Sequence, residues 1–263
     1  MDVIETGVES PAVADVLGTP VFVGDVLSGA KWVVDRATAG VGGYVCLCNV
    51  HLFVVARHDD DVRRALENAT LAFPDGWPVA WLQRRLGHRS AARVAGPDLM
   101  AQAIDDGRRF GVRHFFLGST DEVLGRLEEN LRRRFPGAEI GGRLSLPFFE
   151  RFEPDGFDSA IADVHRASPH VVWLSLGCPK QELWMLRHAQ ELAPSLMVGV
   201  GAAFDFHAGT KTRAPAWLQR AGLEWLHRLL SEPRRLAARY GRTNTEFLVL
   251  AASGLLKRRL RRR

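Results

Sequence analysis

Polar residues follow several apolar runs of this sequence, and Asp75 is the first of them that could do chemistry. It stands in Pro74-Asp75-Gly76, directly after the apolar segment 70–73. A carboxylate in a cleft can take a proton from an attacking hydroxyl if burial raises its pKa. The same tripeptide is also typical of a plain turn, because Pro sets φ and Gly accepts a positive φ. The sequence therefore leaves two interpretations of Asp75, a general base and a turn residue.

Asn49 and Arg93 have side chains that could bind a nucleotide or a sugar. Asn49 ends the segment 44–49, where its amide can donate to or accept from a base, a sugar or a diphosphate. Its alternative role is to turn the chain into a helix. Arg93 carries the planar guanidinium that suits a phosphate, although a solvated surface position fits the sequence equally well. Asp98, which follows Gly96-Pro97, is expected to cap a helix.

Three glycine-containing segments could let a ligand approach the backbone. Gly118 lies between an expected strand and a helix N-terminus, a place suited to phosphate or ribose. Lys180 and Gln181 are expected in the first turn of a helix, at the positive end of its dipole. Gly201 ends a glycine-rich strand exit. Asp205, just beyond, is a second candidate base, with turn capping as its alternative.

Several catalytic motifs are missing from the sequence. It contains no H-E-x-x-H, no G-x-S-x-G and no cysteine–histidine metal array. Asp59-Asp60-Asp61 has the D-x-D form of metal-dependent sugar transferases, but it precedes a helical pattern, so we interpret it as a helix cap. Cys46, Cys48 and Cys178 are too few for a disulfide framework. We therefore expect no metal and no other cofactor.

The elements that must position these residues alternate along the chain. The runs 44–49, 70–73, 114–118, 139–145, 171–177 and 196–201 are predicted strands. The segments 25–37, 60–68, 78–86, 98–109, 120–134, 156–167, 179–191 and 215–229 are predicted helices. Such alternation favours an α/β fold with a doubly wound, mostly parallel, Rossmann-like sheet. In such sheets ligands bind beyond the carboxyl ends of the strands, where the candidates above lie.

The charge of the chain is distributed unevenly. Of 263 residues, 46% are apolar and 25% charged, a composition that excludes disorder throughout. The formal net charge is +5, but residues 213–263 alone carry 13 basic and 3 acidic residues. We expect a flexible extension at 1–19, an α/β domain at 20–209 and a basic helical appendage at 210–263. The basic charge suits an anionic partner such as a membrane surface, a phosphorylated substrate or nucleic acid.

The hydrophobic segments predict that the chain does not cross a membrane. We see no basic-then-apolar leader at the N-terminus. The longest late apolar run, 247–256, has ten residues, whereas a spanning helix needs about 20. Thr243-Asn244-Thr245-Glu246 fits a capping box that would open the last helix. We expect a cytoplasmic protein that lies on the membrane surface.

In their order along the chain, these segments resemble the WecG/TagA/CpsF family of bacterial glycosyltransferases. The matching pieces are Asn49, Pro74-Asp75-Gly76 and residues 93–98, 117–118, 177–182, 199–205, 209–215, 224–228 and 232–240. The resemblance covers residues 20–250, roughly. Each motif is weak alone, but the ordered set is specific.

The resemblance implies a reaction and its partners. A sugar is moved from a UDP-sugar to a polyprenyl-diphosphate-linked saccharide at the inner face of the plasma membrane, with inversion and without a metal. The family makes wall teichoic acid, enterobacterial common antigen and exopolysaccharides, and its known sugars are N-acetylmannosamine and its uronic acid. No nucleic acid is implied as a partner, and a homo-oligomer is left open.

The resemblance also implies roles for individual residues. Asp75 matches the proposed catalytic base, Gln181 the active-site glutamine, and Asn49 and Arg93 the nucleotide-sugar pocket. The basic appendage, expected to close over the diphosphate and dock on the membrane, is matched by Arg228, Arg234, Arg235 and Arg239. Gly118, Lys180, Gly201 and Asp205 complete the expected binding set.

One departure and two rival functions stand beside this assignment. Many relatives have Thr where this chain has Leu47, which puts mannosamine in doubt and favours the exopolysaccharide members, some of which transfer glucose. A nucleotide-sugar oxidoreductase or epimerase would need a complete Gly-rich fingerprint, which residues 24–29 do not supply. A non-enzymatic binder of membrane or nucleic acid would act through the basic tail, but the tail has no reader motif.

Overall fold

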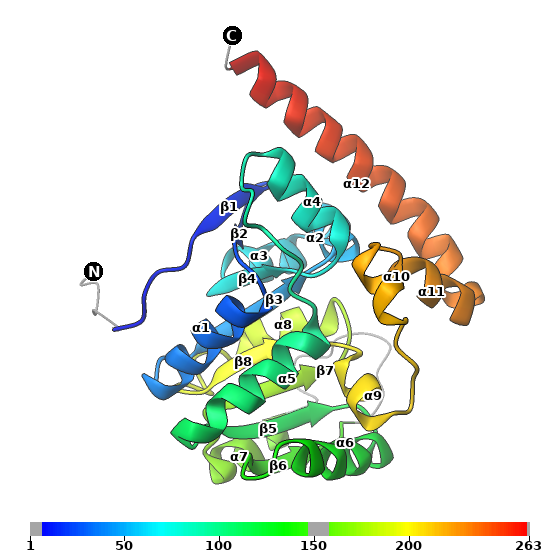
Figure 1. Cartoon of the computed structure of the whole chain (residues 1–263). Coiled ribbons are helices and arrows are strands. Elements are labelled where there is room, and N and C mark those ends of the chain that lie inside the picture. The colour runs from blue at the N-terminus through cyan, green and yellow to red at the C-terminus, as the bar shows by residue number, and fades with distance from the viewer. Residues whose placement is uncertain (1–6, 147–157, 262–263) are drawn as a thin grey trace.

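The computed structural model describes residues 7–146 and 158–261, which fold around a central sheet (Figure 1). Its strands are β1 (Val13–Val16), β2 (Thr19–Phe22), β3 (Gly43–Cys48), β4 (Leu71–Pro74), β5 (Arg113–Gly118), β6 (Glu139–Leu144), β7 (Val171–Ser175) and β8 (Leu196–Gly199). Their order across the sheet is β1-β2-β4-β3-β8-β7-β5-β6, with only β1 antiparallel to its neighbour among the described strands. This confirms the predicted doubly wound, mostly parallel α/β fold.

Helices cover both faces of the sheet (Figure 1). One face packs against α1 (Val26–Thr38), α5 (Gly96–Gly107), α6 (Asp121–Arg134) and α9 (Ala203–Ala208). The other face packs against α2 (Val50–His58), α3 (Asp60–Glu67), α7 (Asp158–Ala167) and α8 (Lys180–His188). The helix α4 (Trp77–Arg85) and the 3-10 turn Arg108–Phe110 complete the body.

Strand β3 shows why the apolar runs form a sheet that is buried on both sides. Val45 and Leu47 point into the core under α1 and α5, while Cys46 and Cys48 point into the core under α2 and α8. Successive side chains of a strand alternate between faces, so a strand with two covered faces is apolar throughout. As expected, both cysteines are free core residues.

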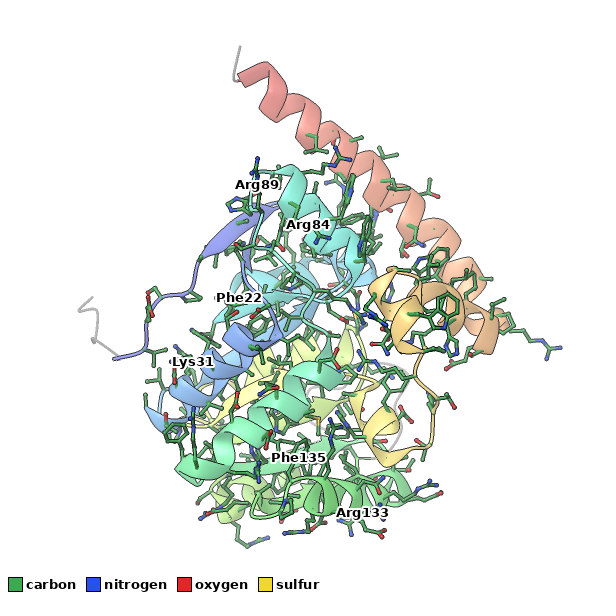
Figure 2. The ribbon with its side chains drawn as sticks, in the orientation of Figure 1. Phe22, Lys31, Arg84, Arg89, Arg133 and Phe135 are labelled. Carbon is green, nitrogen blue, oxygen red and sulfur yellow. The ribbon has the colours of Figure 1, made fainter. Side chains whose placement is uncertain are left out.

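The outer faces of the covering helices are charged. In Figure 2, Lys31 projects from α1 and Arg133 from α6, away from the sheet, and both are exposed. Phe22 at the end of β2 lies instead inside, where its ring meets the edge of Phe73 at a centroid distance of 4.8 Å. The polar and apolar sides of these elements therefore match the predicted amphipathic pattern.

A crevice is expected where neighbouring parallel strands send their connections to opposite faces. Strands β3 and β8 are such neighbours, because Cys46 pairs with Gly199 near their carboxyl ends. The chain leaving β3 enters α2 on one face, and the chain leaving β8 enters α9 on the other. A crevice therefore forms at this edge of the sheet, between the residues that follow Cys48 and those that follow Gly199.

Three helices follow the α/β body: α10 (Ala216–Arg220), α11 (Glu224–Ser231) and α12 (Pro233–Arg261). In Figure 1, α12 starts beside α11, passes α2 and continues beyond the body. It is fixed to α2 by the rings of Phe247 and Phe53, 6.3 Å apart, and by a 2.7 Å contact between His58 Nε2 and Glu246 Oε1. Within residues 7–146 and 158–261, no helix is both long and apolar enough to span a bilayer.

Four expectations about the elements differ from the structure. Residues 13–16, expected to be irregular, form β1, because they pair with β2 and bury Val16. The capping box at Thr243 is wrong, since α12 begins ten residues earlier and runs through that position. The segment 215–229 is split by Gly222, which has a φ of +74°. The strand β2 and the helices α2 and α9 were not predicted.

Candidate active site

A cavity of about 670 Å³ opens at the carboxyl ends of the central strands. Its floor and walls come from residues that follow β3, β4, β7 and β8, including Asn49, Asp75, Gly177 and Gly201. Its far side is formed by α11 and the start of α12, through residues such as Trp225 and Tyr240. The site therefore joins segments from both ends of the chain.

Asp75 is held at this edge by the backbone of the neighbouring strand. Its N–H donates to the carbonyl of Cys48 at 2.9 Å, and Gly76, with a φ of +111°, then turns the chain into α4. The turn interpretation is therefore confirmed, and the turn places the carboxylate at the cavity, where it could also act as a base. Burial raises the pKa of the Asp75 carboxyl, and Arg93 and Arg228 only partly offset this rise. The side chain remains 27% exposed, so a ligand can reach it.

Asn49 also performs two tasks. Its Oδ1 accepts from the backbone N–H of Leu52 at 3.1 Å and so caps α2. Its side chain also lines the cavity and lowers the pKa of the neighbouring Asp75 carboxyl. The capping role is therefore confirmed, and the same side chain lies where a ligand could contact it.

Arg93 is not a solvated surface residue, since its side chain is only 22% exposed. Its Nη1 lies 2.7 Å from Glu224 Oε2, and its Nε lies 4.0 Å from Asp75 Oδ1. The other oxygen of Glu224 is 3.8 Å from Nε of Arg213. Buried charges are tolerated when they are paired in this way. Glu224 of α11 therefore bridges two arginines beside the candidate base.

Asp98 belongs to the same network and is not the helix cap that we expected. The N-cap of α5 is Ala95, and Asp98 lies in the first turn. Both of its oxygens are held by Arg213, at 2.5 and 2.7 Å, in a bidentate pair. The α/β body and the C-terminal helices are thus tied together by charge at the wall of the cavity.

Gln181 lies in the first turn of α8 and is buried. Its Nε2 donates to Glu182 Oε1 at 2.9 Å, whereas its Oε1 receives no hydrogen bond from any described residue. A Cβ on Gly199 would stand 2.8 Å from Nε2, so only glycine at 199 leaves room for this amide. Glu182 is 1% exposed, and burial raises its pKa to about 7.

Arg228, Asp205 and Lys211 form a charged side of the cavity. The guanidinium of Arg228 lies over the ring of Phe206, 5.7 Å from its centroid. Lys211 Nζ is 3.7 Å from Asp205 and 3.6 Å from Glu232. Asp205 also receives a hydrogen bond from Thr210, so it serves the turn as well as the cavity.

The structure brings together most of the predicted site residues. Those lining the cavity are Asn49, Asp75, Arg93, Gln181, Gly201, Asp205 and Arg228. Gly118, Lys180 and Arg234 are not among its described lining residues. Gly118 has another reason to be glycine, since its φ is +97° and a Cβ would stand 2.8 Å from the carbonyl oxygen of Ser175. Arg235 and Arg239 lie on α12, and their side chains are outside the described set.

Sequence reasoning gave no role to Glu182, Lys211 or Glu224. All three lie in segments that carry the family resemblance. Their partners gave no signal, because Arg93 is far from Glu224 in the sequence and the other partners belong to no recognisable pattern. Within the described part of the chain, no group of three or more His, Cys, Asp or Glu side chains is arranged to hold a metal ion. The cations that line the cavity belong to Arg93, Arg228 and Lys211.

Comparison with known proteins agrees with this geometry. The model of the glycosyl transferase WecG/TagA/CpsF family matches residues 14–262. An N-acetylglucosaminyldiphosphoundecaprenol N-acetyl-beta-D-mannosaminyltransferase from Bacillus spizizenii (strain ATCC 23059 / NRRL B-14472 / W23) is 30% identical over 195 residues, which are 74% of this chain and 73% of that protein. A cavity at the sheet switch point, a carboxylate between arginines and a match over nearly the whole chain lead to one conclusion: this protein is a glycosyltransferase of the WecG/TagA/CpsF family.

Proposed function

We propose that this chain transfers a sugar from a UDP-sugar to a polyprenyl-diphosphate-linked saccharide during the synthesis of a cell-surface polysaccharide. The observation that carries the proposal is the half-buried Asp75 carboxylate, which shares the cavity with Arg93 and Arg228. A base and a cluster of cations are what an acceptor hydroxyl and a diphosphate leaving group require. The relative from Bacillus spizizenii carries a name with the same type of acceptor.

The proposed reaction is a single displacement with inversion at the anomeric carbon. The acceptor hydroxyl loses its proton to Asp75 as its oxygen forms the new bond to the anomeric carbon. The bond from that carbon to the diphosphate oxygen breaks, and its electron pair leaves with UDP. Arg93, Arg228 and Lys211 would stabilise the charge that develops on the diphosphate, so the step needs no metal ion.

The raised pKa of Asp75 supports the assignment of the base. A carboxylate with an ordinary pKa near 3.8 is a weak base at neutral pH, and burial moves the pKa of Asp75 upward from that value. The neighbouring Asn49 side chain lowers the pKa of Asp75, but burial outweighs this effect. The activity is therefore expected to fall as the pH drops through the pKa of Asp75.

The donor sugar belongs to the same proposal. The relative is named for N-acetylmannosamine, but Leu47 lines the cavity of this chain where many family members are expected to have Thr. The loss of a hydroxyl at this point favours a donor other than N-acetylmannosamine, such as UDP-glucose. A panel of UDP-sugars decides between them.

We further propose that the protein acts at the inner face of the plasma membrane. The support is the basic sequence of residues 213–263, because each Lys or Arg near an anionic surface contributes about 1 kcal/mol. Residues 20–209 would form the catalytic domain, and residues 210–263 the appendage. Arg234, Arg235 and Arg239 would belong to its membrane-facing or diphosphate-facing side.

The test measures product formation from a panel of UDP-sugars with short-chain lipid-diphosphate sugars. We expect turnover of one donor and a loss of about 10²–10⁴-fold in Asp75→Asn, with UDP binding by calorimetry retained. Asp163→Asn, an exposed substitution on α7, is the matched control. Loss in Asp205→Asn but not in Asp75→Asn would move the base to Asp205. Absence of both turnover and UDP binding in the folded protein would reject the proposal and favour the basic tail as a binder of anionic surfaces.

A further inference from the structure

The side-chain amide of Gln181 is held in one orientation at the cavity, and the proposed reaction gives it no role. One end of the amide, Nε2, donates to Glu182 Oε1 at 2.9 Å. The other end, Oε1, is buried and accepts nothing from the residues that the structure describes. A buried acceptor without a partner destabilises the folded state, so such groups are rare in native proteins. Because Oε1 of Gln181 lies beside a ligand cavity, we expect a bound ligand to donate the missing hydrogen bond.

The surroundings place this free acceptor at the cavity. Gln181 lines the cavity together with Gly199 and Gly201. A Cβ on Gly199 would stand 2.8 Å from Nε2, and one on Gly201 would stand 3.9 Å from Oε1. The amide therefore lies against the backbone of both glycines, with Nε2 near Gly199 and Oε1 near Gly201, just after the end of β8.

We propose that Glu182 is a positioning residue, whose carboxylate fixes the Gln181 amide so that its carbonyl oxygen accepts a hydrogen bond from a hydroxyl or N–H of the bound nucleotide-sugar. The proposal rests on the proposed transfer reaction at this cavity. It identifies the kind of group that Gln181 recognises, because phosphate oxygens offer only acceptors and cannot meet an acceptor favourably. Gln181 thus reads a hydroxyl or N–H and leaves the diphosphate to the arginines.

The chemistry of Glu182 explains why the amide cannot simply rotate. When Glu182 is ionised, as it is above its pKa of about 7, an exchange of Oε1 and Nε2 would bring two acceptor oxygens face to face, and the Nε2 donation to Glu182 would be lost. A neutral Gln at position 182 could donate or accept, and it would stabilise both orientations. Among the described residues, the titratable side chains that interact with Glu182 are the thiols of Cys46, Cys48 and Cys178, so none of them competes with the amide as a cation.

The first test observes the amide directly and needs no turnover. In ¹⁵N-labelled protein, the Gln181 side-chain signals are assigned by their loss in Gln181→Met. We expect two sharp, exchange-protected signals in the wild type, and shifted or averaged signals in Glu182→Gln. Glu122→Gln is the matched control, because its side chain is 79% exposed on α6. Unchanged Gln181 signals in Glu182→Gln would overturn the proposal.

The second test is a double-mutant cycle on transfer kinetics. We expect kcat/KM for the preferred donor to fall about tenfold in Glu182→Gln, the effect of losing one hydrogen bond, and at least as far in Gln181→Met. Because Glu182 acts through Gln181, the double variant should lose no more than Gln181→Met alone. If the fold-loss in kcat/KM of the double variant equals the product of the two single losses, Glu182 acts independently of Gln181, and the proposal is overturned.

UDP affinity then locates the ligand group. A tenfold loss confined to the UDP-sugar places the recognised hydroxyl or N–H on the sugar, whereas an equal loss for UDP places it on the nucleoside. Both outcomes support the positioning of Gln181. If Glu182→Gln changes the Gln181 signals but the wild type transfers no sugar, the proposed function is rejected and the positioning of Gln181 by Glu182 still holds.

Discussion

The removal of Glu224 is predicted to weaken the attachment of α11 to the body of the protein. Glu224 is 10% exposed, and its two oxygens contact Arg93 at 2.7 Å and Arg213 at 3.8 Å. Removing one member of a buried ion pair typically costs 3–5 kcal/mol, because the remaining charge is buried without compensation. Here the cost is reduced, since Arg213 keeps its bidentate pair with Asp98 and Arg93 keeps Asp75 at 4.0 Å. We expect Glu224→Ala to lower the free energy of unfolding by about 2–3 kcal/mol.

Glu224→Gln separates charge from shape in the same position. It retains the hydrogen bond to Arg93 and loses the charge, so its loss should be smaller, about 1–2 kcal/mol. The free energy is measured by urea denaturation, and amide hydrogen exchange shows where protection is lost. Exchange should increase first in α11 and α12, because Glu224 joins these helices to the wall of the cavity.

An exposed glutamate provides the control for this experiment. Glu67 is 57% exposed and lies 3.6 Å from Arg63 on the surface of α3. Surface pairs of this kind contribute about 0–1 kcal/mol, so Glu67→Ala should leave α11 and α12 protected. A loss below about 0.5 kcal/mol in Glu224→Ala, or a loss of protection spread evenly over the molecule, would refute the reasoning.

Two further predictions concern pH and the attachment of α12. Burial raises the pKa of Glu182 from 4.5 to about 7, so the folded state binds the proton more tightly and its stability falls as the pH rises between these values. Glu182→Gln should therefore gain stability relative to the wild type between pH 5 and pH 8, by at most about 3 kcal/mol in urea denaturation; an equal difference at both pH values would contradict this. Phe247 is 2% exposed and packs against Phe53, so Phe247→Ala should cost about 3 kcal/mol and speed tryptic cleavage within α12. Unchanged cleavage would show that another contact holds the helix.

Strands β3, β4, β5, β7 and β8 were predictable because each is a short apolar run. The antiparallel pair β1 and β2 was missed, since each strand has only four residues and β1 contains Asp15 on its exposed side. The helix α2 was missed because Val50–His58 is mostly apolar and follows β3 after Asn49 alone, so its pattern is close to that of a buried strand. The false capping box at Thr243 shows that a local motif does not start a helix that is already formed.

The candidate site was predictable as far as it depends on strand ends. Asn49, Asp75 and Gln181 each follow a buried strand, and the carboxyl ends of parallel strands meet at one edge. The pairing of Arg93 with Glu224 was not predictable, because 131 residues separate them and each resembles an ordinary surface charge in the sequence. The choice of Ser119 over Gly118 as a lining residue also depends on a backbone angle that the sequence does not reveal.

The helix α2 has a consequence for how substitutions along it must be interpreted. It is capped by Asn49, which lies at the cavity beside Asp75, and it carries Phe53 and His58, which contact α12. With nine residues at about 1.5 Å each, α2 spans roughly 14 Å between the candidate base and the last helix. A substitution that tilts or frays α2 should therefore change both the rate of sugar transfer and the packing of α12. Variants of α2 should therefore change sugar transfer and the attachment of α12 together, whereas variants of the Asp75 turn can change sugar transfer alone.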